Sequence, residues 1–109
     1  MKVNILGATY TIYYRDETQD EYLKTADGYC DKTTKEIVVT KRPSHSELGD
    51  WEAYSKKVLR HEIIHAFLIE SGLCENFEHH TWGHDETMID WIAYQFPKIL
   101  DVYTKVGCL

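Results

Sequence analysis

The sequence predicts an α+β fold in which a small antiparallel sheet is followed by two helices. The first third of the chain is rich in β-branched and aromatic residues, which strands favour. From about residue 50 onward, apolar residues recur at three- and four-residue steps, the period of an amphipathic helix. No repeat, low-complexity tract or Pro/Gly-rich linker divides the 109 residues. We therefore expect one domain over residues 1–109.

The expected strands fall in the first 40 residues. Residues 5–14 are predicted to be extended, with a kink or turn at Gly7. Residues 27–30 and 36–40 flank a polar segment whose composition is typical of a hairpin turn. The charged stretch over residues 15–24 shows no clear pattern. Two to four short strands would thus form a sheet with one face covered.

Two helical segments are expected after the strands. The first covers residues 50–71, since Gly72 is a natural C-cap. The second starts near residue 85, where acidic side chains suit a helix N-terminus. Pro97 is expected to end it and to permit a further short helix over residues 98–106. An apolar stripe should pack the second helix against the core: Met88, Ile89, Ile92, Ala93 and Phe96.

Composition excludes several classes of function. The formal net charge is −6 and no Lys/Arg cluster offsets it, so a nucleic-acid ligand is not expected. No apolar stretch approaches the length of a membrane span, and the N-terminus lacks the pattern of a secretory signal. The three cysteines are an odd number and lie far apart, which favours reduced thiols in a cytoplasmic protein.

The strongest functional signal is the segment His61-Glu62-Ile63-Ile64-His65. On a helix, residues i and i+4 project from one face, so both imidazoles can reach one metal ion. Neutral imidazole is a good ligand for Zn²⁺, and a catalytic zinc site adds a third protein ligand and keeps one position open. Glu62 stands beside the first histidine, where it can act as a general base. The sequence therefore predicts a zinc site on the first helix.

The third ligand has to come from the downstream part of the chain. Glu86 lies at the start of the second expected helix, and Asp90 follows at i+4 on the same face. Asp90 could accept a hydrogen bond from the outward ring nitrogen of His61 and so fix its tautomer. Alternative ligands lie in the loop over residues 73–84: His84, His80 and His79. A loop histidine could instead steady an oxyanion, as could Tyr94 or Tyr103.

The segment 61–65 and the later segment Glu86-Thr87-Met88-Ile89-Asp90 together resemble the gluzincin family of HExxH metallopeptidases. The resemblance covers mainly residues 58–96 and implies a minimal zincin core. It implies that zinc is bound by His61, His65 and Glu86, that the base is Glu62, and that Asp90 supports the ligands. In length the chain resembles the minimal gluzincins, and in style it resembles the short HExxH proteins of phages and Gram-positive bacteria.

Two functions fit such a site. In the first, the chain is a zinc metallopeptidase that cleaves a peptide or protein substrate with zinc-activated water. In the second, it is a non-catalytic or latent zinc-binding module that acts through a protein partner. The second interpretation follows from the short chain, which lacks the subdomain that completes the cleft of larger gluzincins. Both leave the oligomeric state open.

Two further hypotheses concern access to the metal. Residues 36–40 are a candidate edge strand, on which an extended peptide substrate could pair. Cys108 lies next to the C-terminal residue and could place a thiolate in the open metal position. Such a contact would hold the protein in a latent state.

Overall fold

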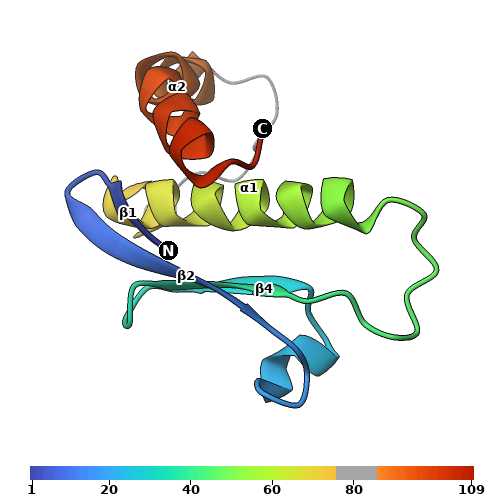
Figure 1. Cartoon of the computed structure of the whole chain (residues 1–109). Helices are drawn as coiled ribbons and strands as arrows, with labels where there is room; N and C mark the ends of the chain where they lie inside the picture. Colours follow the sequence, from blue (N-terminus) through green and yellow to red (C-terminus); the bar gives the residue numbers. More distant parts are fainter. Residues whose placement is uncertain (76–85) are drawn as a thin grey trace.

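The computed structural model describes residues 1–75 and 86–109, apart from the side chains of residues 86, 89, 90 and 93. The elements follow in the order β1 (Lys2–Ile5), β2 (Ala8–Arg15), the 3-10 helix η1 (Glu21–Lys24), β3 (Gly28–Asp31), β4 (Glu36–Thr40), α1 (Trp51–Glu70), the 3-10 helix η2 (Leu73–Glu75) and α2 (Glu86–Val106). They form three layers, in which α1 lies on the sheet and α2 lies over α1 (Figure 1). The predicted α+β fold, with its sheet before two helices, is confirmed.

The sheet is mixed, with the strand order β1-β2-β4-β3. β1 pairs with β2 and β3 pairs with β4 in antiparallel hairpins, whereas β2 and β4 run parallel. Parallel neighbours need a crossover connection, and here the segment that holds η1 and β3 provides it. The expectation of an antiparallel sheet is therefore correct within each hairpin and wrong where the hairpins join. Strand patterns alone do not determine which strand of the second hairpin meets the first.

β4 occupies the centre of the sheet. Its residues Ile37, Val38 and Val39 are fully buried, so both faces of the strand are covered. β2 and β3 pair with its two edges. The hypothesis that residues 36–40 offer a free edge to a substrate is therefore wrong, and the outer strands are β1 and β3.

α1 packs its apolar face on the sheet. The side chain of Asp50 caps the helix by accepting a hydrogen bond from the backbone N–H of Ala53 at 3.0 Å. Gly72 follows the last turn with a φ of +80°, so the limits agree with the predicted range 50–71. One buried cluster joins the helix to β1, β2 and β4: Val58, Leu59, Ile63, Ala66 and Phe67 with Ile5, Tyr10, Ile12, Ile37 and Val39.

α2 is a single helix that continues through Pro97. The prediction that Pro97 divides it into two is wrong, because contacts with α1 hold both halves in place. Near the start, the indole Nε1 of Trp91 donates to Ser71 Oγ at 3.4 Å. Near the end, the hydroxyl of Tyr103 donates to the carbonyl of Arg60 at 3.2 Å, and Ile99 lies in the core.

The predicted apolar stripe of α2 is only partly buried. Ile92 is 48% exposed and Phe96 is 54% exposed, so neither packs in the core as expected. Burial of α2 instead depends on Ile99 and Val102, farther along the helix. Within the described residues, no helix is both long and apolar enough to cross a membrane.

Cys108 belongs to the core. Its side chain is 1% exposed, and burial raises the pKa of the thiol. The guanidinium Nη1 of Arg60 donates to its carbonyl at 2.6 Å, which attaches the C-terminal segment to α1. The hypothesis that Cys108 holds the protein latent through a metal-bound thiolate is wrong, because this side chain is packed inside the protein rather than carried on a free tail.

Candidate metal centre

α1 brings His61, Glu62 and His65 into one group. The Nε2 atoms of the two histidines lie 3.1 Å apart, because residues four apart stack on successive turns of a helix. One ligand atom from each of the three residues lies within 4.8 Å of the others. Both histidines are exposed, whereas Glu62 is only 6% exposed. The group can therefore hold a metal ion at the surface of α1 with a carboxylate beneath it.

The spacing of the imidazoles fits a zinc-sized ion. A zinc ion is bound by histidine nitrogen at about 2.0–2.1 Å. For an ion at that distance from both Nε2 atoms, the N–metal–N angle would be about 100°, close to the tetrahedral angle. The pKa of His65 is lowered, first by desolvation and then by nearby His61. Both effects favour the neutral imidazole, which is the form that binds metal.

Glu62 is positioned by burial. Its side chain is only 6% exposed and lies close to β3, since a Cβ atom built at Gly28 would come within 3.5 Å of its Cγ atom. Desolvation disfavours the charged carboxylate and raises the pKa of Glu62 to about 7. A carboxyl group with a pKa near 7 suits a residue that both accepts and returns protons.

Gly28 allows β3 to lie directly against α1 at this position. A Cβ atom at Gly28 would lie 2.8 Å from the carbonyl oxygen of Val38 and 2.8 Å from Cγ1 of Val58. It would also lie 3.5 Å from Cγ of Glu62. Any side chain at this position would push the outer strand and the helix apart. Gly28 therefore determines the width of the cleft beside Glu62.

A small cavity of about 230 Å³ opens beside the metal group, between the start of β3 and α1. It is lined by Asp27, Gly28, Tyr54, Lys57, Val58, His61 and Glu62. The hydroxyl of Tyr54 donates a hydrogen bond to the carboxylate of Asp27, which links the two walls. The site therefore has a shaped space in which a substrate group could lie next to the metal ligands.

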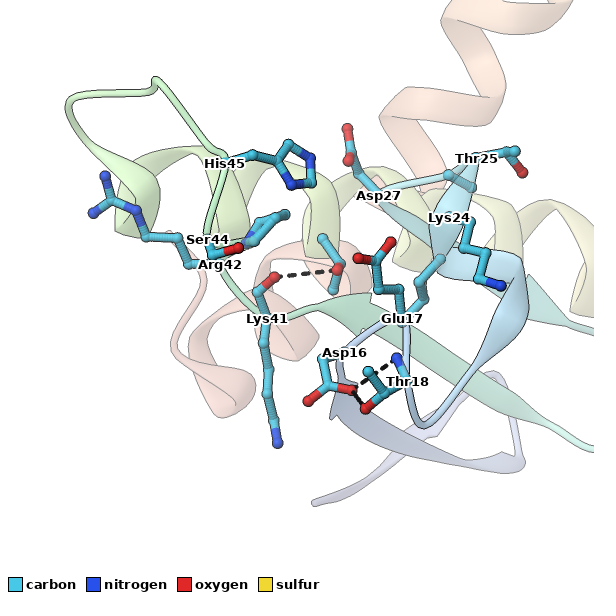
Figure 2. A pocket seen from close by; sticks show the side chains of 14 residues that line it. Asp16, Glu17, Thr18, Lys24, Thr25, Asp27, Lys41, Arg42, Ser44 and His45 are labelled. Atoms are coloured by element: carbon cyan, nitrogen blue, oxygen red, sulfur yellow. Dashed lines mark hydrogen bonds between the residues drawn. The ribbon is translucent and has the colours of Figure 1, made fainter.

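A second cavity, of about 460 Å³, adjoins the first at Asp27, which lines both. Its walls come from the segments around η1 and from the start of the β4–α1 connection. Figure 2 shows Glu17 and His45 directed toward the middle of this space, whereas the charged ends of Lys41 and Arg42 extend outward. This cavity contains none of the residues predicted from the sequence to bind metal.

The structure tests the predicted site residues unevenly. His61, Glu62 and His65 come together as expected. Glu86 is the first residue of α2, but its side chain and that of Asp90 lie outside the described residues. The alternative ligands in the loop lie outside them too: His79, His80 and His84. The identity of the third ligand therefore stays a prediction.

The two tyrosines considered as oxyanion donors have other surroundings. Tyr94 is 79% exposed on α2. The hydroxyl of Tyr103 is engaged with the backbone carbonyl of Arg60. Neither lines the cavity beside His61 and Glu62.

Sequence reasoning did not assign five residues to the cleft: Asp27, Gly28, Tyr54, Lys57 and Val58. Tyr54 and Lys57 precede His61 by two turns and by one turn of α1, so their position on its face was a usable signal. No signal in the sequence indicated Asp27 and Gly28, because their place depends on which strand lies outermost beside α1. The missed residues are those that shape the space around the metal group.

Comparison with models of protein families, with curated proteins and with solved structures finds no match to this chain. Function therefore has to be inferred from the site itself. Among the described residues, His61, Glu62 and His65 are the one group of three or more His, Cys, Asp or Glu side chains that could hold a metal ion.

Proposed function

We propose that this chain is a zinc-dependent metallopeptidase, which hydrolyses peptide bonds with activated water. The observation that carries the proposal is the approach of the two Nε2 atoms to 3.1 Å, directly beside the buried carboxyl group of Glu62. Two imidazole ligands with a carboxylate base beside them are typical of hydrolytic zinc sites. The likeness to gluzincins and a cytoplasmic location belong to the same proposal.

The proposed ligand set is His61, His65 and Glu86. Histidine nitrogen and carboxylate oxygen are ligands that zinc accepts together, and three protein ligands leave one position open for chemistry. Asp90 is proposed to orient His61 through its outward ring nitrogen. His84, His80 and His79 are the alternatives for the third ligand.

Each side chain then has a defined task. His61 and His65 hold the ion through their Nε2 atoms, which the helix already places at a suitable spacing. When bound, zinc supplies a Lewis acid that polarises the substrate carbonyl and acidifies water. Glu62 takes a proton from the attacking water at a carboxylate oxygen and delivers it to the leaving amine nitrogen. Burial against β3 keeps the Glu62 side chain largely out of water, since it is only 6% exposed.

The proposed substrate is a peptide or an extended segment of a protein. β3 supports this class, because it is an outer strand whose first residue lines the cavity beside His61. An extended chain could pair along the outer edge of β3 and bring a carbonyl to the metal.

A mixed peptide library tests the proposal. The zinc-loaded protein is incubated with the library, with and without a chelator, and new termini are identified by mass spectrometry. We expect cleavage that stops with the chelator and returns on addition of zinc. One bound zinc without any chelator-sensitive cleavage would contradict the peptidase and favour the non-catalytic module.

A further inference from the structure

Lys57 lies one helical turn before His61 and lines the same small cavity. Four residues of α-helix rise about 6 Å, so its Cα atom stands about that far along α1 from the first histidine. Its side chain is exposed and long enough to reach toward the space above the metal group. A positive charge and the metal-ligand candidate His61 therefore line the same cavity.

The position of the Lys57 ammonium is supported by its neighbours. It lies 5.8 Å from the centre of the Tyr54 ring, within the range of a cation–π contact. The Tyr54 hydroxyl is itself fixed by its hydrogen bond to Asp27 across the cleft. Asp27, the Tyr54 ring and the Lys57 ammonium thus form a chain of contacts beside the cavity.

Lys57 has no carboxylate partner within ion-pair distance among residues 1–75 and the described side chains of α2. The adjacent Lys56 differs, because it pairs with Glu52 at 3.2 Å. Asp27 shares the cavity with Lys57 and accepts the Tyr54 hydroxyl, but within the described part of the chain it forms no ion pair with Lys57. Lys57 is the one Lys or Arg side chain among the described residues that line this cavity, so it is the group there that could attract an anionic ligand.

We propose that Lys57 binds a carboxylate of the substrate and thereby selects peptides that carry this group close to the bond that is cleaved. This inference rests on the proposed function and adds a substrate class to it. An extended chain advances about 3.3–3.6 Å per residue, so the carboxylate would lie one or two residues beyond the reacting carbonyl. The group is either the C-terminus of the peptide or the side chain of an Asp or Glu.

Three small thiols test this inference without requiring hydrolysis. Mercaptoacetyl-alanine carries a thiol that binds zinc and a terminal carboxylate at the other end. Mercaptoacetyl-alaninamide lacks the charge, and mercaptoacetyl-aspartamide carries it on the side chain only. Their affinities for the zinc-loaded protein are measured by calorimetry for the parent chain, Lys57→Gln and the matched control Lys56→Gln. Bound zinc is quantified for each protein.

We expect at least one carboxylate thiol to bind the parent and Lys56→Gln about tenfold more tightly than alaninamide does, because a charge-assisted hydrogen bond is gained. Lys57→Gln should bind all three thiols equally. The preferred carboxylate thiol distinguishes a terminal from a side-chain source. If the parent binds all three thiols equally, or if Lys57→Gln keeps the preference for a carboxylate thiol, the inference is overturned.

The two proposals can fail separately. Loss of the carboxylate preference in Lys57→Gln, with no peptide cleavage by the parent, would support the ligand site and contradict the peptidase. Peptide cleavage with no carboxylate preference would support the peptidase and overturn the role of Lys57. Absence of bound zinc in the parent would overturn both, since the thiols would then have no metal to bind.

Discussion

The Nε2 atoms of His61 and His65 lie 3.1 Å apart on successive turns of α1. At this distance two imidazoles can share a proton, with one ring as donor and the other as acceptor. They can also share a cation, which replaces the proton and is held by both lone pairs. The histidines need no rearrangement of the backbone to bind a metal, because the helix already sets their spacing.

Glu62→Gln should separate metal binding from catalysis. The amide is close in size to the carboxyl group and fits the same buried position, but it cannot accept a proton from water. We expect bound zinc to stay at the parent level and the rate of peptide cleavage to fall by about 10²–10⁴-fold. Zinc content and cleavage rate are measured on the same preparation. Parent-level cleavage by the variant would contradict the assignment of Glu62 as the base.

Glu86→Gln should weaken zinc binding. Loss of a direct ligand is expected to lower the affinity by more than about 100-fold, whereas Asp90→Asn should lower it by about tenfold. The affinities are measured by competition with a chromophoric chelator, with His84→Ala as the comparison. If His84→Ala releases zinc and Glu86→Gln does not, the third ligand is the histidine.

Gly28→Ala should destabilise the protein. The added methyl group would lie 2.8 Å from both Val38 O and Val58 Cγ1, so the outer strand has to move away from α1. Overpacking of this kind costs about 1–3 kcal/mol. Gly49→Ala is the matched control, because a Cβ atom there meets nothing within 4 Å. Urea unfolding measures both, and an equal effect of the two substitutions would contradict the close approach at Gly28.

The free energy of unfolding should fall in acid, because the Glu70 carboxylate becomes protonated. That carboxylate accepts hydrogen bonds from Lys35 and from the hydroxyl of Tyr10, the latter at 2.7 Å, and these lower the pKa of Glu70 below its usual 4.5. Because the folded pKa is the lower one, the stabilisation is present above pH 4.5 and is lost as the pH falls through the folded value.

Glu70→Gln should therefore reduce the free energy of unfolding by about 1 kcal/mol at pH 7 and by less at pH 3. Glu52→Gln is the control, since Glu52 forms only an exposed pair with Lys56 and should change little at either pH. A deficit of Glu70→Gln that is the same at both pH values would show that the carboxylate charge does not contribute.

Local signals predicted most of the fold. Asp50 and Gly72 predict the range 50–71 for α1, within one residue of the observed Trp51–Glu70 at each end, because capping depends on residues next to the helix. The parallel pairing of β2 with β4 could not be predicted, since it depends on contacts between distant hairpins. The break predicted at Pro97 is wrong because tertiary contacts also decide whether the helix continues. The missing N–H of Pro97 weakens one turn, but packing of Trp91 and Ile99 on either side keeps α2 continuous.

The candidate site divides in the same way. His61, Glu62 and His65 lie on one helix, so their convergence follows from the spacing of residues in the sequence. Asp27 and Gly28 join them only because β3 is the outer strand beside α1, a tertiary relationship that the strand pattern does not contain.

Metal stoichiometry tests the central claim most directly. The parent protein and the double variant His61→Ala, His65→Ala are dialysed against zinc, and the bound metal is measured by elemental analysis. We expect about one zinc per parent chain and none above background in the double variant, with both proteins folded by circular dichroism. A parent that binds no zinc, or a double variant that binds as much as the parent, would contradict the assignment of this histidine pair as a metal site.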